Sequence, residues 1–243
     1  MVPVPLATDK MIAEIDGAVG WVIFNNPARR NAVSVDMWRA IPAIFDRFEA
    51  EPAVRAIVLR GAGEAAFVSG LDISQFEDEF SSSRAAAGLE ALSARANRRI
   101  QTSSKPTIAM IDGFCIGAGV QIATSCDIRI AADTATLAIT AAKLGLGYPV
   151  SSLKRLLDIV GPSAVKEIFF TGGRFSAAEA EIMGLVNRVV PAAQLESTVR
   201  AYGGAIADNA PLAIQAVKQM LDKAVSPEVE LAACGRLESH SWT

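Results

Sequence analysis

Two glycine turns are the parts of this sequence whose residue types and spacing suit chemistry. They span residues 67–73 (FVSGLDI) and residues 111–119 (IDGFCIGAG), and the second runs into a predicted helix. Glycine lets the backbone approach a ligand closely, and a helix N-terminus presents unpaired N–H groups with partial positive charge. Two such N–H groups on one oxygen make an oxyanion hole. Packing turns are the plainer interpretation, since neither turn carries a nucleotide-binding fingerprint.

The rare residue types exclude several other chemistries. His240 is the only histidine, which excludes a His-based triad or a multi-histidine metal site unless the C-terminus folds back. Cys115, Cys126 and Cys234 have no C-x-x-C spacing, so we expect no disulfide framework and no metal site. The formal net charge of −3 gives no reason to expect a nucleic-acid partner.

The elements that position these turns are predicted from turn residues and periodicity. Asp16-Gly17 separates two β-rich runs and predicts a hairpin over residues 11–24. Ser34 is a candidate N-cap for an amphipathic helix over residues 35–50. Further strands are predicted over residues 56–59, 66–68, 107–111, 127–130 and 136–139, with helices over residues 85–102 and from the second turn to residue 125.

The character of the sequence changes after Pro149. From there we predict helices only, at about residues 150–160, 162–171, 176–183, 192–208 and 211–224. With 243 residues, 51% of them hydrophobic and 20% charged, the chain has material for one sizeable core. Strands alternating with helices, then helices alone, indicate an α/β core over residues 1–190 and a C-terminal helical region over residues 191–243.

Leader and membrane segments are not expected. The N-terminal residues lack a basic region followed by a continuous apolar run. The most apolar stretch, residues 107–124, is interrupted by Asp112 and Gln121 and is shorter than the ~20 residues that span a bilayer. We therefore expect a cytoplasmic protein with no membrane partner.

Several blocks of sequence, taken together, are recognisable. They are residues 26–34 (NPARRNAVS), 67–73, 105–108 (KPTI), 112–121 (DGFCIGAGVQ), 126–132 (CDIRIAA), 143–145 (KLG), 171–173 (TGG) and 178–187 (AEAEIMGLVN). In this order they resemble successive blocks of the enoyl-CoA hydratase/isomerase (crotonase) family, over about residues 10–225. The resemblance implies an α/β fold of the ClpP/crotonase type, a spiral of ββα units with a C-terminal helical trimerisation region.

The same resemblance implies a site for an acyl-CoA thioester. The backbone N–H groups of Leu71 and Ala118 match the oxyanion hole, and alanine in place of the usual glycine keeps the N–H. CoA arrives as part of the substrate, so no separate cofactor is expected. The CoA adenine and pantetheine are expected to contact Arg30, Ala32, Ser69, Gly70, Asp72, Ile73 and Gly117.

The sequence departs from the family at the two glutamates of its hydratases. Gln121 and Ala141 occupy the matching positions. Glutamine can hold a water molecule but is no base at neutral pH, and alanine does neither. We therefore predict poor hydration of crotonyl-CoA by an enzyme that works through a thioester enolate.

Two alternatives stay open. Tyr148, which can donate a hydrogen bond beside the expected acyl pocket, could serve a decarboxylase or an isomerase. The methylmalonyl-CoA decarboxylase branch of the family is resembled by Thr140, Leu144-Gly145, Tyr148 and residues 165–167 and 210–214. Leu71 weakens that resemblance, because the branch has a histidine there. The loss of both glutamates also suits a non-catalytic acyl-CoA-binding protein. In either case the resemblance implies a homotrimer or a hexamer.

Overall fold

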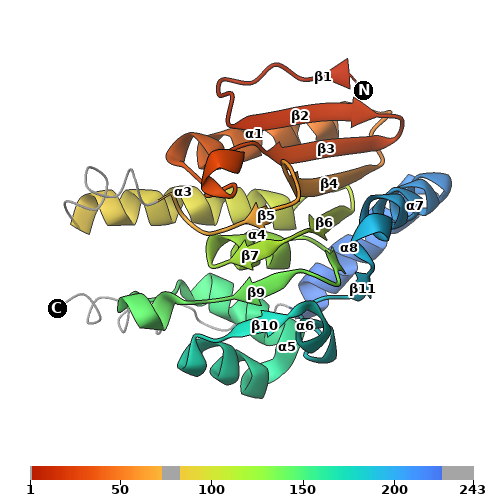
Figure 1. The fold of residues 1–243 in the computed structure, drawn as a ribbon. Helices are drawn as coiled ribbons and strands as arrows, with labels where there is room; N and C mark the ends of the chain where they lie inside the picture. The colour runs from red at the N-terminus through yellow and green to blue at the C-terminus, as the bar shows by residue number, and fades with distance from the viewer. Residues whose placement is uncertain (1, 73–82, 226–243) are drawn as a thin grey trace.

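Two sheets and the helices around them make up the fold in the computed structural model, which describes residues 2–72 and 83–225 (Figure 1). In this part of the chain the larger sheet has the order β1-β2-β3-β4-β6-β8-β11. Its strands are β1 (Val2–Pro3), β2 (Met11–Asp16), β3 (Val19–Phe24), β4 (Ala56–Gly61), β6 (Thr107–Ile111), β8 (Ile128–Ala132) and β11 (Arg188–Val190). The smaller sheet has the order β10-β9-β7-β5, with β5 (Ala66–Val68), β7 (Phe114–Ile116), β9 (Thr136–Ala138) and β10 (Arg174–Ser176).

The helices alternate with these strands and then follow them. They are α1 (Val35–Ala50), α3 (Ser83–Gln101), α4 (Ala118–Ser125), α5 (Val150–Thr171), α6 (Ala177–Ile182), α7 (Leu195–Asp208) and α8 (Pro211–Val225). Short 3₁₀ helices are η1 (Pro27–Arg29), η3 (Ala141–Leu144) and η4 (Ala192–Gln194). The helix α5 bends at Gly161, where φ is 76°, so the two predicted helices 150–160 and 162–171 form one kinked element.

The chain repeats one pattern along the core. A first strand joins the larger sheet, a second strand joins the smaller sheet, and a helix follows. Among the described elements this holds for β4, β5 and α3, for β6, β7 and α4, and for β8, β9 and α5. Neighbouring strands of successive units pair in parallel. The expected spiral of ββα units is therefore confirmed.

The larger sheet is apolar on both faces because helices cover both. Along β4, Ile57 and Leu59 enter the main core with α1, whereas Val58 points to the opposite face. That second face packs against Leu195 and Val199 of α7. This explains why β4 reads as a continuous apolar run rather than an alternating one.

The strands that were predicted before residue 140 are confirmed, whereas the prediction of helices only after Pro149 is wrong. The hairpin forms, and Ser34 caps α1 by accepting a hydrogen bond from the Met37 N–H at 3.5 Å. The region after Pro149 is not helical throughout, because β10 and β11 add strands to the two sheets. The expected division at residue 190 stays a prediction.

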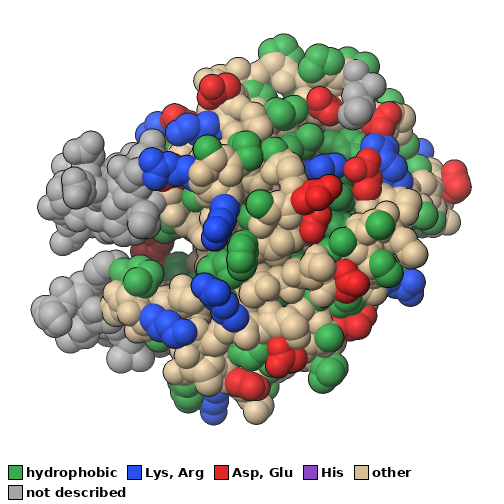
Figure 2. Space-filling model, in the orientation of Figure 1, with side chains coloured by type: hydrophobic (Ala, Val, Ile, Leu, Met, Phe, Trp, Pro, Cys, Tyr) green, Lys and Arg blue, Asp and Glu red, His purple; other side chains and the backbone are tan. Residues whose placement is uncertain are grey.

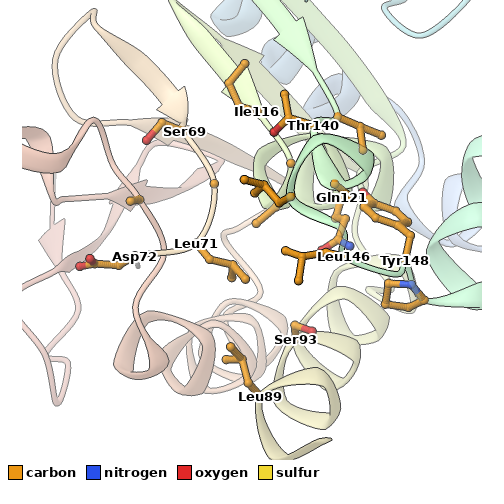
Figure 3. A pocket seen from close by; sticks show the side chains of 18 of the residues that line it. Ser69, Leu71, Asp72, Leu89, Ser93, Ile116, Gln121, Thr140, Leu146 and Tyr148 are labelled. Carbon is orange, nitrogen blue, oxygen red and sulfur yellow. The ribbon is translucent and has the colours of Figure 1, made fainter. Parts of the chain in front are cut away.

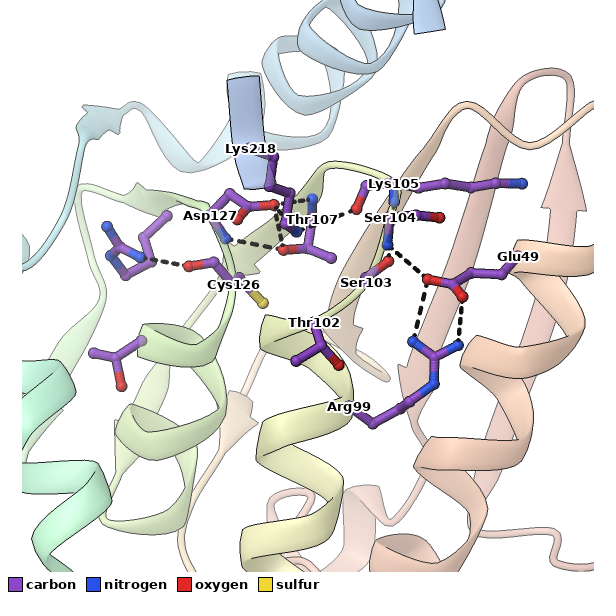
Figure 4. A network of polar contacts seen from close by, with 12 residues as sticks. Glu49, Arg99, Thr102, Ser103, Ser104, Lys105, Thr107, Cys126, Asp127 and Lys218 are labelled. Atoms are coloured by element: carbon purple, nitrogen blue, oxygen red, sulfur yellow. Dashed lines mark hydrogen bonds and ion pairs between the residues drawn. The ribbon is translucent and has the colours of Figure 1, made fainter. Parts of the chain in front are cut away.

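Helix α8 is attached to the core by a polar network (Figure 4). The Lys218 Nζ lies 2.7 Å from Asp127 Oδ2. The same carboxylate oxygen accepts hydrogen bonds from the Thr107 N–H at 2.8 Å and hydroxyl at 2.9 Å. Because Thr107 begins β6 and Asp127 precedes β8, this contact fixes α8 to the N-terminal ends of two central strands.

None of the helices within residues 2–72 and 83–225 combines the length and apolar character that a membrane crossing requires. The longest helix, α5, has 22 residues but carries Lys154, Arg155, Asp158, Lys166 and Glu167. The cytoplasmic location stays a prediction.

Candidate active site

The two glycine turns lie at the same edge of the smaller sheet. The first follows β5 and the second follows β7, and these strands pair in parallel, so their C-terminal ends are neighbours. Gly70 has φ 118° and Gly117 has φ 54°, a region that residues with a Cβ rarely adopt. The two turns therefore bring Leu71 and the start of α4 to the same edge of the smaller sheet.

Close packing fixes α4 against the first turn. A Cβ on Gly119 would lie 2.3 Å from the Val68 carbonyl oxygen, so only glycine lets the helix approach β5 this closely. The Gly117 N–H donates to the Ala138 carbonyl at 2.8 Å and holds the helix start to β9. On the other side, the Val33 N–H donates to Gly70 O at 2.9 Å.

Leu71 and Ala118 each keep a backbone donor for a ligand. Neither N–H finds an acceptor among residues 2–72 and 83–225, although hydrogen bonds at Gly70, Asp72 and Gly117 fix the backbone on either side. Ala118 is the first residue of α4, where the N–H has no partner within the helix. The helix dipole adds partial positive charge there. The arrangement suits an oxygen that gains negative charge.

A cavity of about 670 Å³ adjoins both amides (Figure 3). Its wall combines the turn after β3, the first glycine turn, α3, the start of α4 and the segment from β9 to α5. It is mainly apolar, with charged lining residues in the first three segments only. The described lining residues are Ala28, Arg29, Arg30, Ala32, Ser69, Gly70, Leu71, Asp72, Leu89, Glu90, Ser93, Ile116, Gly117, Ala118, Gln121, Ile139, Thr140, Ala141, Leu144, Leu146, Gly147, Tyr148 and Pro149.

The residues expected to contact CoA line one part of this wall. Arg30, Ala32, Ser69, Gly70, Asp72 and Gly117 all belong to the lining, whereas Ile73 lies outside the described residues. Arg29 Nη1 lies 3.9 Å from Asp72 Oδ1, and the Arg30 guanidinium lies over the Phe114 ring at 5.2 Å. Lys and Arg side chains also surround a hollow on the face drawn in Figure 2.

Asn31 supports this part of the wall and was not singled out from the sequence. It is buried with φ 56°, and its side-chain Nδ2 donates to Ala62 O at 3.0 Å and to Ala66 O at 2.7 Å. Its Oδ1 accepts from the Asn26 N–H at 3.0 Å. The side chain thus ties the arginine-bearing turn to the strand that leads into the first glycine turn. An Asn in a turn after a strand is the only signal that indicated it.

Gln121, Ala141 and Tyr148 meet on the opposite wall. Gln121 lies one helical turn after Ala118 on α4, and Ala141 begins η3. The Gln121 and Tyr148 side chains lie side by side in the cavity wall (Figure 3), and the Tyr148 ring meets Phe169 edge-on with centroids 4.8 Å apart. Burial raises the pKa of Tyr148, and the neighbouring Gln121 side chain opposes that rise. Tyr148 is therefore a neutral donor near neutral pH.

Helix α3 contributes Leu89, Glu90 and Ser93 to the lining, which sequence reasoning missed. Leu89 and Ser93 are four residues apart and point into the cavity together (Figure 3). The spacing predicted a helix, but nothing in it showed which face would cover a ligand.

The described thiols take no part in the site. Cys115 and Cys126 are fully buried, and burial raises both pKa values, that of Cys126 to about 12. Across residues 2–72 and 83–225, no group of three His, Cys, Asp or Glu side chains is placed to hold a metal ion. Cys234 and His240 lie outside the described residues.

The fold and the cavity together define the class. A spiral of ββα units whose glycine turns present two free amides to an apolar cavity is the crotonase fold. A solved enoyl-CoA hydratase/carnithine racemase from Magnetospirillum magneticum matches with a TM-score of 0.88 and 31% identity, over 95% of this chain and 88% of that one.

Comparison of sequences gives the family. The model of the enoyl-CoA hydratase/isomerase family matches residues 14–240. A short-chain-enoyl-CoA hydratase of Clostridium acetobutylicum is 33% identical over 92% of this chain and 85% of its own length. A peroxisomal Delta(3,5)-Delta(2,4)-dienoyl-CoA isomerase of Arabidopsis thaliana is 31% identical over 88% of this chain and 81% of its own length. The chain belongs to the enoyl-CoA hydratase/isomerase family.

Proposed function

We propose that this enzyme processes an acyl-CoA thioester through an enolate whose oxygen is held by the Leu71 and Ala118 N–H groups. The observation that carries the proposal is the pair of unpartnered amides at one edge of an apolar cavity. Enolate formation moves negative charge onto the thioester oxygen, and fixed donors stabilise that charge without any titrating side chain. The relatives named as hydratase and isomerase both act on CoA thioesters.

The CoA portion is proposed to lie along the wall formed by Arg30, Ala32, Ser69, Gly70 and Asp72. Arg29 and Arg30 offer positive charge for the nucleotide phosphates. CoA then belongs to the substrate, and the reaction needs no separate cofactor.

Hydration of a double bond is proposed to be slow in this enzyme. Gln121 and Ala141 line the cavity, and the family resemblance matches them to the two glutamates of its hydratases. General acid–base assistance contributes about 10²–10⁴-fold per group. Without these carboxylates the site can stabilise an enolate, but it lacks the two groups that activate water and protonate carbon.

The second candidate is an acyl-CoA decarboxylase or isomerase in which Tyr148 supplies the polar contact. Its supporting observation is that Tyr148 lines the cavity beside Gln121. A non-catalytic acyl-CoA-binding protein is the third, and the absence of a carboxylate at positions 121 and 141 favours it.

A panel of enoyl-, malonyl- and 3-hydroxyacyl-CoA thioesters, analysed by mass spectrometry, separates these functions. The proposal expects turnover of at least one thioester, with crotonyl-CoA a poor substrate. Rapid hydration of crotonyl-CoA would contradict the role given to Gln121 and Ala141. Tight binding with no product from any thioester would establish the non-catalytic protein.

Ala118→Pro tests the oxyanion donor directly. Proline fits the first position of a helix and replaces the N–H hydrogen with a ring carbon, so the donor is lost while α4 should persist. We expect turnover to fall by about 10²–10³-fold, with little change in the thermal unfolding midpoint. Ala118→Gly, which keeps the N–H, should retain turnover. A fully active proline variant would refute the assignment.

The family resemblance also leads us to propose a homotrimer or a hexamer. Helix α8 exposes Leu212, Val217, Met220 and Leu221, each more than half accessible in the single chain. Apolar side chains gathered on one element favour burial against another subunit. These residues are the proposed contact surface.

A further inference from the structure

Tyr148 lies across the cavity from the wall that is proposed to hold CoA. Figure 3 shows Ser69 on one side of the cavity and Tyr148 on the other, with Leu71 between them. A thioester whose oxygen meets the Leu71 N–H, with its CoA portion on the Ser69 side, therefore directs its acyl chain toward Tyr148. This direction rests on the proposed function.

A second aromatic ring, that of Phe169, packs against Tyr148 from outside the cavity. The two ring centroids are 4.8 Å apart and the ring planes meet at 74°. Phe169 is partly buried against the main core and does not belong to the described lining of the cavity. Edge-to-face pairs of this kind contribute stability beyond the area that they bury. The Tyr148 ring is therefore supported on a side that a ligand does not reach.

The kink in α5 makes this contact possible. Tyr148 precedes the helix and Phe169 lies near its C-terminal end. A straight helix of 22 residues would be about 33 Å long and would carry the two rings far apart. Gly161, with φ 76° and ψ 170°, has a conformation that is almost restricted to glycine. The contact between the rings therefore depends on the bend at Gly161.

The backbone of Tyr148 is held as firmly as its ring. A residue before proline has few allowed conformations, and Pro149 follows directly. The Pro149 carbonyl accepts hydrogen bonds from the Ser152 and Leu153 N–H groups, each at 3.0 Å, which fixes it to the first turn of α5. An acyl chain that reaches Tyr148 thus meets a wall that does not readily withdraw.

We propose that Tyr148 closes the acyl end of the cavity and sets the longest acyl chain that this enzyme binds, with Phe169 acting through it as a positioning residue. Before the ring, the chain passes apolar side chains such as Leu146. Each methylene group that is buried there raises the affinity about fourfold. The gain ends where the chain meets the ring, because a longer chain must displace packed aromatic groups or remain in water.

Calorimetric titration with butyryl-, hexanoyl-, octanoyl- and decanoyl-CoA tests the proposal. In the original enzyme we expect the affinity to rise with chain length and to stop rising within this series. Tyr148→Ala should let the rise continue, so that the longest thioester gains about tenfold or more while butyryl-CoA is little affected. Tyr148→Leu, a smaller change in volume, should move the limit in the same direction and keeps the test valid if the alanine variant does not fold.

Substitutions at Phe169 test the positioning role. Phe169→Ala leaves the lining residues unchanged but removes the support of the Tyr148 ring, so the limit should again move to longer chains. Phe169→Leu, which refills most of the space, should restore the original limit. Phe170→Ala is the matched control, because this neighbouring ring on the same helix is 80% exposed, and it should leave the limit in place.

The outcomes separate this inference from the proposed function. An affinity that rises without a break through decanoyl-CoA, or a break that stays in place in both Tyr148 variants, would overturn the inference and leave the acyl-CoA site standing. Equal effects of Phe169→Ala and Phe170→Ala would contradict the role of Phe169. Failure of every thioester to bind would overturn the proposed function and the inference with it. Thermal unfolding of each variant identifies any loss of fold.

Discussion

The absence of carboxylates at two lining positions sets the chemistry available to this enzyme. In the proposed function, Gln121 and Ala141 leave the acyl end of the cavity without a carboxylate among the described lining residues, although Leu71 and Ala118 keep their amide donors. A neutral tyrosine whose pKa is raised by burial cannot replace a base either. Stabilisation of charge, rather than proton transfer, is the contribution that these residues can make.

Restoring the two carboxylates should restore hydration. We expect Gln121→Glu combined with Ala141→Glu to raise crotonyl-CoA hydration at least 100-fold, since each acid–base group contributes about 10²–10⁴-fold. Loss of the ultraviolet absorbance of crotonyl-CoA measures the rate. The single variants and Ala141→Gln, which adds bulk without a base, serve as controls. Hydration at the original rate in a folded double variant would show that some other feature limits this reaction.

Some of the individual residues that line the cavity could be predicted from the sequence. Gly70 and Gly117 have positive φ values in the structure. The glycine turns suggested a site, and the family resemblance assigned the donors to Leu71 and Ala118. The residues of α3 could not be found in this way. A helical period fixes which residues share a face, but the face that meets a cavity is decided by packing between elements distant in the sequence.

Helix α4 is the element on which the site depends most. It is short, and its position relative to β5 is set by the approach of Gly119 to the Val68 carbonyl. Any added atom there meets backbone rather than a flexible side chain. The distance between the two amide donors is therefore coupled to one packing contact.

Gly119→Ala should separate the amides and weaken the fold. The added methyl group would lie 2.3 Å from the Val68 oxygen, so α4 must shift, at a cost of about 1–3 kcal/mol. Gly204→Ala in α7 is the matched control, because nothing lies within 4 Å of its added Cβ. That change should stabilise the fold by about 0.5–1 kcal/mol. Urea unfolding measures both, and equal effects would contradict the packing argument.

The strands that were missed are all very short. β1 has two residues and β7, β10 and β11 have three each, too few for an alternating pattern to emerge. β10 follows Gly172-Gly173 and passes directly into α6, so its sequence reads as a helix start. Pairing with β9, which lies about forty residues earlier, makes it a strand.

At the scale of the molecule, helix α8 both packs against the core and exposes apolar side chains. One side of α8 is held through Lys218 to Asp127, while Val217, Met220 and Leu221 on the same helix are exposed. The core and the ββα spiral followed from local signals and the family resemblance. Which surface of α8 would face another subunit in the proposed assembly has no local signal, because apolar residues that pack within the chain and those that stay exposed follow the same helical period.

Val217→Lys combined with Met220→Lys should dissociate the proposed assembly. The original enzyme is expected to have three or six times the mass of one chain in light scattering, and the variant the mass of one chain. Two buried charges at an apolar contact are not compensated. Val2→Lys in the edge strand β1, at a similarly exposed position away from α8, should leave the mass unchanged. A monomeric original enzyme would rule out the assembly.

The two amides at the glycine turns have a consequence for how this sequence tolerates change over generations. Every residue except proline carries a backbone N–H, so almost any codon change at position 71 or 118 leaves the donor present. The glycines that shape the turns are constrained, while the side chains facing the acyl group are free to vary. Selection can therefore replace a residue such as Gln121 or Ala141, and with it the reaction, while the anion site is inherited intact.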